Sequence, residues 1–155
     1  MATQSLQPLE LVRGGWKTSV PEAAGQSFKR GELIYLVAGL ATVVASDGVV
    51  IYGMALQDAT GTTSTMIDVL EFDSSTILRG NVYHSTPASA VTARANVGIK
   101  YAVYVGSNKV HVDIEDTGND AFVIVSLDEG EVGDIYGRCY FKVLPAVLQT
   151  EAAAT

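Results

Sequence analysis

The chain has 155 residues, of which 48% are hydrophobic and only 17% are charged, and its formal net charge is −7. A chain of this length is expected to form one domain whose core needs neither a metal nor a disulfide. The acidic balance argues against nucleic acid as a partner, because phosphate binding depends on Lys and Arg. The low charge fraction leaves much of the surface neutral or apolar, which suits either an extensive protein interface or a rigid β core.

The first 24 residues differ in character from the rest of the chain. They contain two of the four prolines, Pro8 and Pro21, and the single tryptophan, Trp16. The prolines, together with Gly14–Gly15, oppose a long helix. We expect residues 1–24 to form an extended arm whose apolar side chains order on a partner, with Trp16 as an anchor. The alternative is a first strand that packs on its own barrel.

Short apolar runs interrupted by glycine follow one another from residue 25 to residue 145, and they predict antiparallel strands. The clearest hairpin turns at Gly106, Ser107 and Asn108. In its second strand, polar His111 and its alternate neighbours are expected to face water. The expected strands are Leu33–Val37, Leu40–Ala45, Val49–Leu56, Ser64–Phe72, Leu78–Tyr83, Ala90–Ala95, Ile99–Val105, Lys109–Glu115, Ala121–Leu127 and Cys139–Leu144.

No segment shows a sustained helical period of apolar residues. The succession of short strands therefore predicts an all-β fold, in the form of a small antiparallel β-barrel or sandwich. Residues 146–155 form a tail that is expected to make a helical turn or fray. The expected organisation is an arm over residues 1–24, a β-barrel domain over residues 25–145 and a tail over residues 146–155.

Residues that could carry chemistry are few. Two histidines, His84 and His111, are too few for a typical zinc or iron site. Cys139 lies among apolar neighbours, so a small buried side chain is expected rather than a reactive thiol, and no local motif supports a nucleophile built from Cys139, His111 and Asp113. We therefore assign no catalytic, cofactor-binding or metal-binding residue.

Two further groups of residues leave alternatives open. The acidic segments 113–116 and 128–134 lack the spaced pattern of a dedicated calcium loop, so solvated loops are expected and loose calcium binding is the alternative. Seven tyrosines spread over many strands would suit a carbohydrate-binding face if they were exposed. The N-terminus lacks the basic and apolar regions of a signal peptide, and no run is long enough for a membrane helix, so we expect a protein made in the cytoplasm.

A pattern of glycines and apolar residues carries a family resemblance. Its first part consists of Gly25, Phe28, Lys29 and Gly31, the hairpin across Gly39, and the segment Gly53–Ala59. Its later blocks are Val112–Asp113, Asp116–Thr117, Gly133–Asp134 and Gly137–Arg138. With these residues the chain resembles the capsid decoration proteins of tailed bacteriophages, also called cement or head-stabilisation proteins. The resemblance covers about residues 25–145 and is weakest in the first 24 residues.

The resemblance implies a small β-barrel or β-tulip-like domain on the outer surface of an expanded phage capsid. Such proteins commonly form trimers that clamp neighbouring major capsid proteins, and they have no active site and no cofactor. The implied partners are the major capsid protein and two further copies of the chain. The residues expected to contact the capsid or a sister subunit are Leu9, Leu11, Val12, Arg13, Trp16, Phe28 and Lys29.

Two consequences of this interpretation can be tested. Deleting residues 1–24 is expected to leave a folded domain that binds the capsid less tightly. The alternative function is a β-rich module that binds carbohydrate or a cell-surface ligand, and it requires an exposed platform of tyrosines.

Overall fold

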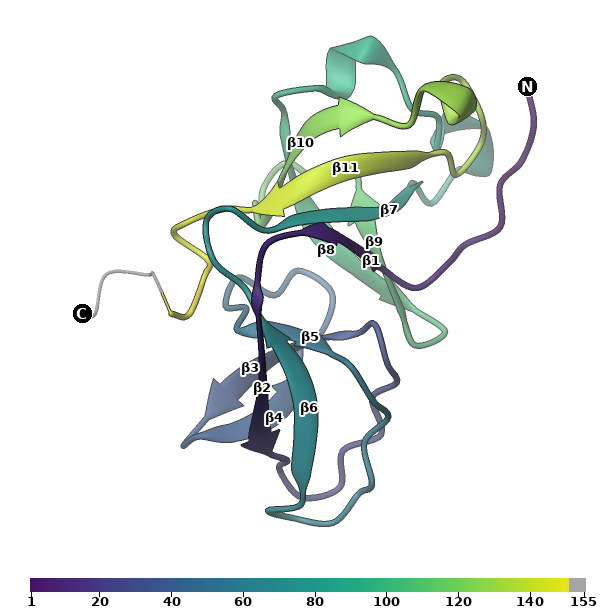
Figure 1. The fold of residues 1–155 in the computed structure, drawn as a ribbon. Helices are drawn as coiled ribbons and strands as arrows, with labels where there is room; N and C mark the ends of the chain where they lie inside the picture. The colour runs from purple at the N-terminus through teal and green to yellow at the C-terminus, as the bar shows by residue number, and fades with distance from the viewer. Residues whose placement is uncertain (151–155) are drawn as a thin grey trace.

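The computed structural model describes residues 1–150, which form an all-β protein with 6% of the chain in helices and 43% in strands. A barrel and a second sheet lie one above the other (Figure 1). The strands are β1 (Glu10–Arg13), β2 (Trp16–Pro21), β3 (Leu33–Val37), β4 (Leu40–Val43), β5 (Gly53–Ala55), β6 (Met66–Glu71), β7 (Ile77–Tyr83), β8 (Lys100–Gly106), β9 (Lys109–Asp113), β10 (Phe122–Leu127) and β11 (Arg138–Val143). Three short 3₁₀ helices are η1 (Pro87–Ser89), η2 (Arg94–Asn96) and η3 (Glu129–Glu131). Within residues 1–150, no helix has the length and apolar character needed to cross a bilayer.

The upper part of the molecule is a closed five-stranded barrel, which confirms the predicted fold class. Its strands pair in the order β7-β11-β10-β8-β9, and β9 pairs back onto β7. This closing pair is parallel, with Val82 opposite Val112, whereas the other barrel pairs are antiparallel. Apolar side chains fill the interior, where the rings of Phe122 and Phe141 lie 4.6 Å apart.

The lower part is a five-stranded sheet with the order β2-β6-β5-β3-β4. Both of its faces are apolar. In β3, Leu33 belongs to the large core that the sheet shares with the barrel, whereas Ile34 belongs to a smaller core of its own around Phe28. Burial on both faces explains why β3 and β5 read as continuous apolar runs, whereas the edge strand β2 is polar and largely exposed.

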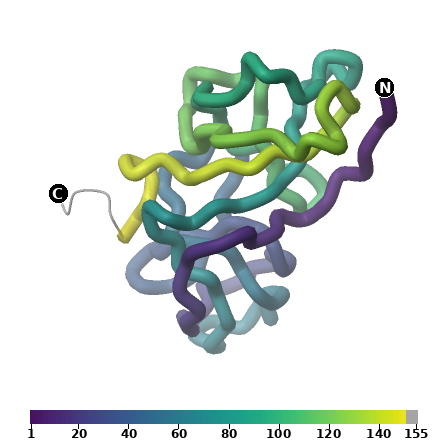
Figure 2. Tube along the Cα trace, turned by 45° about the horizontal axis from the view of Figure 1, so that its top comes forward, coloured from purple at the N-terminus to yellow at the C-terminus, as the bar shows by residue number. Residues whose placement is uncertain are grey.

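Residues 1–24 are part of both sheets. Strand β1 pairs with β7 as an extra strand beside the barrel, and β2 pairs with β6 over its whole length. Ahead of β1, the chain runs along the barrel (Figure 2), where the backbone of Gln4 donates to the carbonyl of Ile135 at 2.8 Å and Leu9 is buried. The expected extended arm is therefore not found, and the alternative of a first strand packed on its own barrel describes these residues.

Two glycines turn the chain from one sheet to the other. Gly14 and Gly15 have φ values of 80° and 84°, in the left-handed region that glycine adopts at little cost. A Cβ atom on Gly14 would lie 2.8 Å from the Cα atom of Thr76, so the turn also packs closely against the loop before β7. This turn places β1 beside the barrel and β2 at the edge of the lower sheet.

Two further expectations differ from the structure, and a third is decided between its two alternatives. The expected strand Ala90–Ala95 is instead an isolated bridge at Val91 followed by η2. His111 is buried rather than wet, because aromatic rings cover it. Of the two alternatives for the tail, a helical turn or fraying, the structure shows the turn up to residue 150: the amide of Leu148 donates to the carbonyl of Leu144 at 3.2 Å, and Leu148 is fully buried and bridged to Ile51. Residues 151–155 of that tail lie outside the described residues.

Candidate functional site

The residues around the Gly14–Gly15 turn present large apolar side chains to solvent. Leu11, Val12 and Trp16 are 42%, 48% and 66% exposed, and Arg13 between them is exposed as well. We call Leu11, Val12, Arg13 and Trp16 the β1–β2 surface. Leu11 and Val12 are consecutive in β1, so their side chains face opposite sides of the strand, and exposed apolar groups on such a short segment are candidates for contact with a partner. The sequence had assigned all four to partner contact.

Hollows lie on both sides of β1. Val12 and Arg13 line a hollow of about 310 Å³ on the outer face of the barrel, together with Ile77, Val125 and Tyr140. On the other side, Leu11 lines a groove of about 580 Å³ whose opposite wall belongs to the lower part of the molecule. That wall is formed by Arg30, Gly31, Met54 and Leu56. Strand β1 thus stands between two concave surfaces that have apolar walls.

The three other residues that the sequence assigned to contact have different surroundings. Leu9 and Phe28 are buried, Leu9 in the large core and Phe28 in the small one, so neither side chain is available to a partner in this conformation. Lys29 is exposed, and its Nζ atom lies 3.7 Å from a carboxylate oxygen of Asp58. The candidate surface therefore consists of the β1–β2 surface, with Lys29 apart from it.

A network of charges ties β1 to the barrel. The Arg79 guanidinium donates to Glu10 at 3.2 Å and also pairs with Asp128. Arg138 donates to Glu131 through its Nε atom at 2.9 Å, and this contact lowers the pKa of the Glu131 carboxyl below its usual value. The acidic loop after β10 was expected to be solvated, but these two carboxylates pair with arginines of β7 and β11. Glu131 and Arg138 are seven residues apart, whereas the partners of Arg79 lie 69 and 49 residues away, so no local pattern could reveal the Arg79 part of the network.

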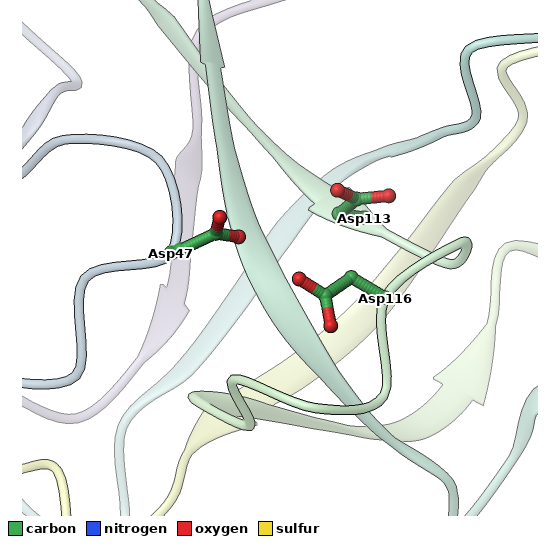
Figure 3. Close-up of side chains that lie close together, drawn as sticks. All are labelled: Asp47, Asp113 and Asp116. Carbon is green, nitrogen blue, oxygen red and sulfur yellow. The ribbon is translucent and has the colours of Figure 1, made fainter.

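Three carboxylates meet on another part of the barrel. Asp47, Asp113 and Asp116 each place a carboxylate oxygen within 4.8 Å of the others; Asp113 and Asp116 lie at the end of β9 and in the turn after it, and Asp47 lies in the loop after β4 (Figure 3). A hydrogen bond with Asp116 raises the pKa of Asp47, and burial raises the pKa of Asp113. Oxygen ligands in such a group suit a hard cation such as Ca²⁺. The expected loose calcium site joined residues 113–116 to residues 128–134, whereas the structure joins Asp113 and Asp116 to Asp47.

The sulfur of Cys139 is enclosed in the barrel core. The side chain is fully buried, as the sequence predicted, and burial raises the pKa of its thiol. A thiol that stays protonated is a poor nucleophile and a poor metal ligand. Cys139 is therefore a packing residue.

No family model matches the chain, and no curated protein sequence matches it.

Proposed function

We propose that this protein is a non-enzymatic structural component of a tailed-phage virion, which binds the outer surface of an expanded capsid and clamps neighbouring major capsid proteins. The β1–β2 surface is the observation that carries the proposal. It concentrates three exposed apolar side chains and an arginine on one short stretch of chain. The resemblance of residues 25–145 to capsid decoration proteins supplies the identity of the partner.

The energetics of the surface suit an interface. Leu11 and Val12 are already about half buried, so burial of the rest of each side chain by a partner would contribute about 1 kcal/mol. Tryptophan is enriched among the residues that dominate binding energy, and Trp16 has the largest exposed fraction of the three apolar side chains. Backbone pairing and the Glu10–Arg79 ion pair hold the segment in place, so little ordering entropy is lost on binding.

The proposal includes assembly as a homotrimer on the capsid, made in the host cytoplasm and located on the outside of the virion. A repeated lattice of such contacts gains from avidity, so each single contact need not be strong. The net charge of −7 disfavours direct contact with packaged DNA. The contact surface differs from the one expected at first, because β1 and β2 present it as parts of two sheets and not as a free arm.

A carbohydrate-binding module is the alternative function, and no specific observation favours it. Each of the seven tyrosines is buried or half-buried. Tyr83 and Tyr104 stack on each other with ring centroids 3.6 Å apart, which hides one face of each ring. An exposed aromatic platform of the kind that sugars stack on is therefore not formed by these residues.

The first test is co-sedimentation of the full chain with undecorated heads of its phage, in expanded and unexpanded forms. We expect saturable binding to expanded heads only. Trp16→Ala should weaken this binding by tenfold or more, because it removes the largest exposed apolar group of the surface.

Met66→Ala is the matched control. Met66 is 57% exposed and lies at the far end of the pairing between β2 and β6, opposite Pro21. Its truncation should leave binding unchanged. Absence of binding to either head form would contradict the decoration function. Equal binding by Trp16→Ala and the unaltered chain would contradict the assignment of the β1–β2 surface.

A further inference from the structure

A small cavity opens on the side of the barrel. It shares no lining residue with the β1–β2 surface. Its volume is about 190 Å³, the share of about six molecules of liquid water. Its lining includes Leu6 from the N-terminal segment, Tyr83 from β7, Tyr104 from β8, Ser107 from the hairpin turn, and Lys109 and His111 from β9. None of the assignments made so far uses this cavity.

The histidine in the wall of the cavity is unusual. His111 is only 1% exposed, and its Nδ1 atom has no hydrogen-bond partner among the described residues. A buried polar atom without a partner costs free energy, and native proteins rarely leave one without a reason. Burial and then the charge of Lys109 lower the pKa of His111 to about 4, so at pH 7 the ring is neutral and carries one N–H group.

The other polar groups of the cavity are hydrogen-bond donors. Tyr83 and Tyr104 stack on each other with ring centroids 3.6 Å apart, and each hydroxyl has a proton that it can donate to an acceptor in the cavity. Ser107 adds a hydroxyl and Lys109 adds an ammonium group. No carboxylate lines the cavity. The cavity therefore offers hydrogen-bond donors and a positive charge, and no negatively charged side chain lines it.

Lys109 is a positive charge beside the cavity that has no ion-pair partner among residues 1–150. The chain has 17 acidic and 10 basic residues, so carboxylates are plentiful. Yet among residues 1–150 no ion pair includes Lys109, although its side chain is half-buried beside the cavity. A half-buried ammonium is stabilised more by an anionic partner than a fully exposed one is, because burial removes part of its hydration.

We propose that this cavity binds a small oxyanion, a carboxylate or phosphate group, held by the ammonium of Lys109 and by donors from Ser107, His111 and the tyrosine pair. The volume admits a group of four or five heavy atoms. Leu6 completes one wall, so the site forms only while the N-terminal segment lies on the barrel. The oxyanion can be a free anion or a carboxylate presented by a neighbouring protein, and the two share the same recognition chemistry.

The two histidines provide a direct test. His84 and His111 give separate ring signals in a long-range ¹H–¹⁵N spectrum of the full ¹⁵N-labelled chain, and His84 does not line the cavity. Titration with sodium acetate, and separately with sodium phosphate, at fixed pH and ionic strength should move the His111 signals saturably and leave those of His84 in place. The expected dissociation constant is about 1–10 mM, which is in reach of a ligand with four or five heavy atoms.

Lys109→Met should weaken the binding by tenfold or more, whereas Lys100→Met, at an exposed lysine at the start of β8, should leave it unchanged. The backbone amide spectrum verifies the fold of each variant, and Lys109→Gln replaces Lys109→Met if the latter does not fold. Saturation with acetate alone identifies a carboxylate, and saturation with phosphate alone identifies a phosphoryl group. The proposal is overturned by equal shifts of both histidines, by equal shifts with sodium chloride, by the absence of saturation, or by unchanged binding in the Lys109 variants.

Discussion

The barrel and the five-stranded sheet are closed in different ways. In the barrel, β9 pairs with β7 over consecutive residues, and arginine–carboxylate pairs cover the outer face. In the lower sheet, the outer strands β2 and β4 meet at a single bridge between Glu22 and Ala41. Glu22 is fully buried there, and its carboxylate accepts hydrogen bonds from the backbone and hydroxyl of Thr60. The barrel is thus closed by a ladder of its own, whereas the sheet depends on one bridge and on the core that it shares with the barrel.

The largest effect is expected from deleting residues 1–24, because these residues give an edge strand to each part of the molecule. The deletion removes β1 and β2, the buried side chains of Leu9 and Val20, and the bridge at Glu22. It should abolish cooperative folding, which replaces the sequence-based expectation of a folded remainder. A thermal melt followed by circular dichroism measures this. Deletion of residues 1–3, ahead of these elements, is the control, and a sharp melting transition in the longer deletion would contradict the prediction.

Two buried phenylalanines compare the cores of the two parts. Phe141→Ala in the barrel and Phe28→Ala in the lower sheet should each lower the free energy of unfolding by about 3–5 kcal/mol. If the sheet depends on the barrel, Phe141→Ala should increase amide exchange throughout the chain. Phe28→Ala should increase it mainly in β2 to β6. Hydrogen exchange read by mass spectrometry distinguishes the patterns, and identical patterns would mean that the two parts open as one unit.

The barrel should also be the pH-sensitive part, because of His111. Its pKa is lowered from 6.5 to about 4 in the folded chain, so the unfolded chain binds more protons between these values. Stability should therefore fall as the pH drops from 6.5 to 4, by at most about 3 kcal/mol. The groups that face the ring are Lys109 of its own strand and the rings of Tyr83 and Tyr104.

Urea unfolding at several pH values measures this dependence. His111→Gln should reduce the fall in stability between pH 6.5 and 4, because glutamine does not titrate; the fall that remains belongs to carboxyls such as Glu131, whose pKa is lowered in the folded chain. His84→Gln is the control and should keep the slope of the unaltered chain, since His84 lies outside the core beside Glu115. A slope in His111→Gln as steep as that of the unaltered chain would assign the pH dependence to other groups.

The comparison of the two parts also explains which features the sequence could predict. The turns at Gly39 and at Ser107–Asn108 have positive φ values, and the glycine and asparagine in them predict such turns from the local sequence. The alternation of β9 predicted which side chains point into the barrel. It could not predict that His111 is covered, because alternation tells only the face on which a side chain lies, and the covering rings of Tyr83 and Tyr104 come from other strands.

Long-range pairing accounts for the other differences. Nothing near Glu10–Arg13 indicates that this segment pairs with β7, because its partner Leu78 lies far along the chain. The exposure of Leu11, Val12 and Trp16 fits the contact role that the sequence assigned to them. The predicted free arm does not fit the structure, because β1 and β2 pair with β7 and β6. The meeting of Asp47 with Asp113 has the same cause, since it depends on how the loop after β4 reaches the barrel.

The smallest effect is expected at the bridge that closes the lower sheet. Glu22→Gln keeps the shape of the side chain but replaces one acceptor oxygen with an NH₂ donor beside the Thr60 donors. Loss of one charge-assisted hydrogen bond should lower stability by about 1–2 kcal/mol. Exchange should increase at the amides of Ala23 and Thr60, near the bridge, and stay unchanged in the barrel.

Glu129→Gln supplies the matched glutamate on the barrel. Glu129 is exposed and pairs with Arg94 at the surface, so its replacement should change neither stability nor exchange. If Glu22→Gln left exchange near the bridge unchanged, the lower sheet would be closed by its packing against the barrel and not by the Glu22 carboxylate. Neither part would then need a buried carboxylate for its closure, and the two would differ only in strand pairing.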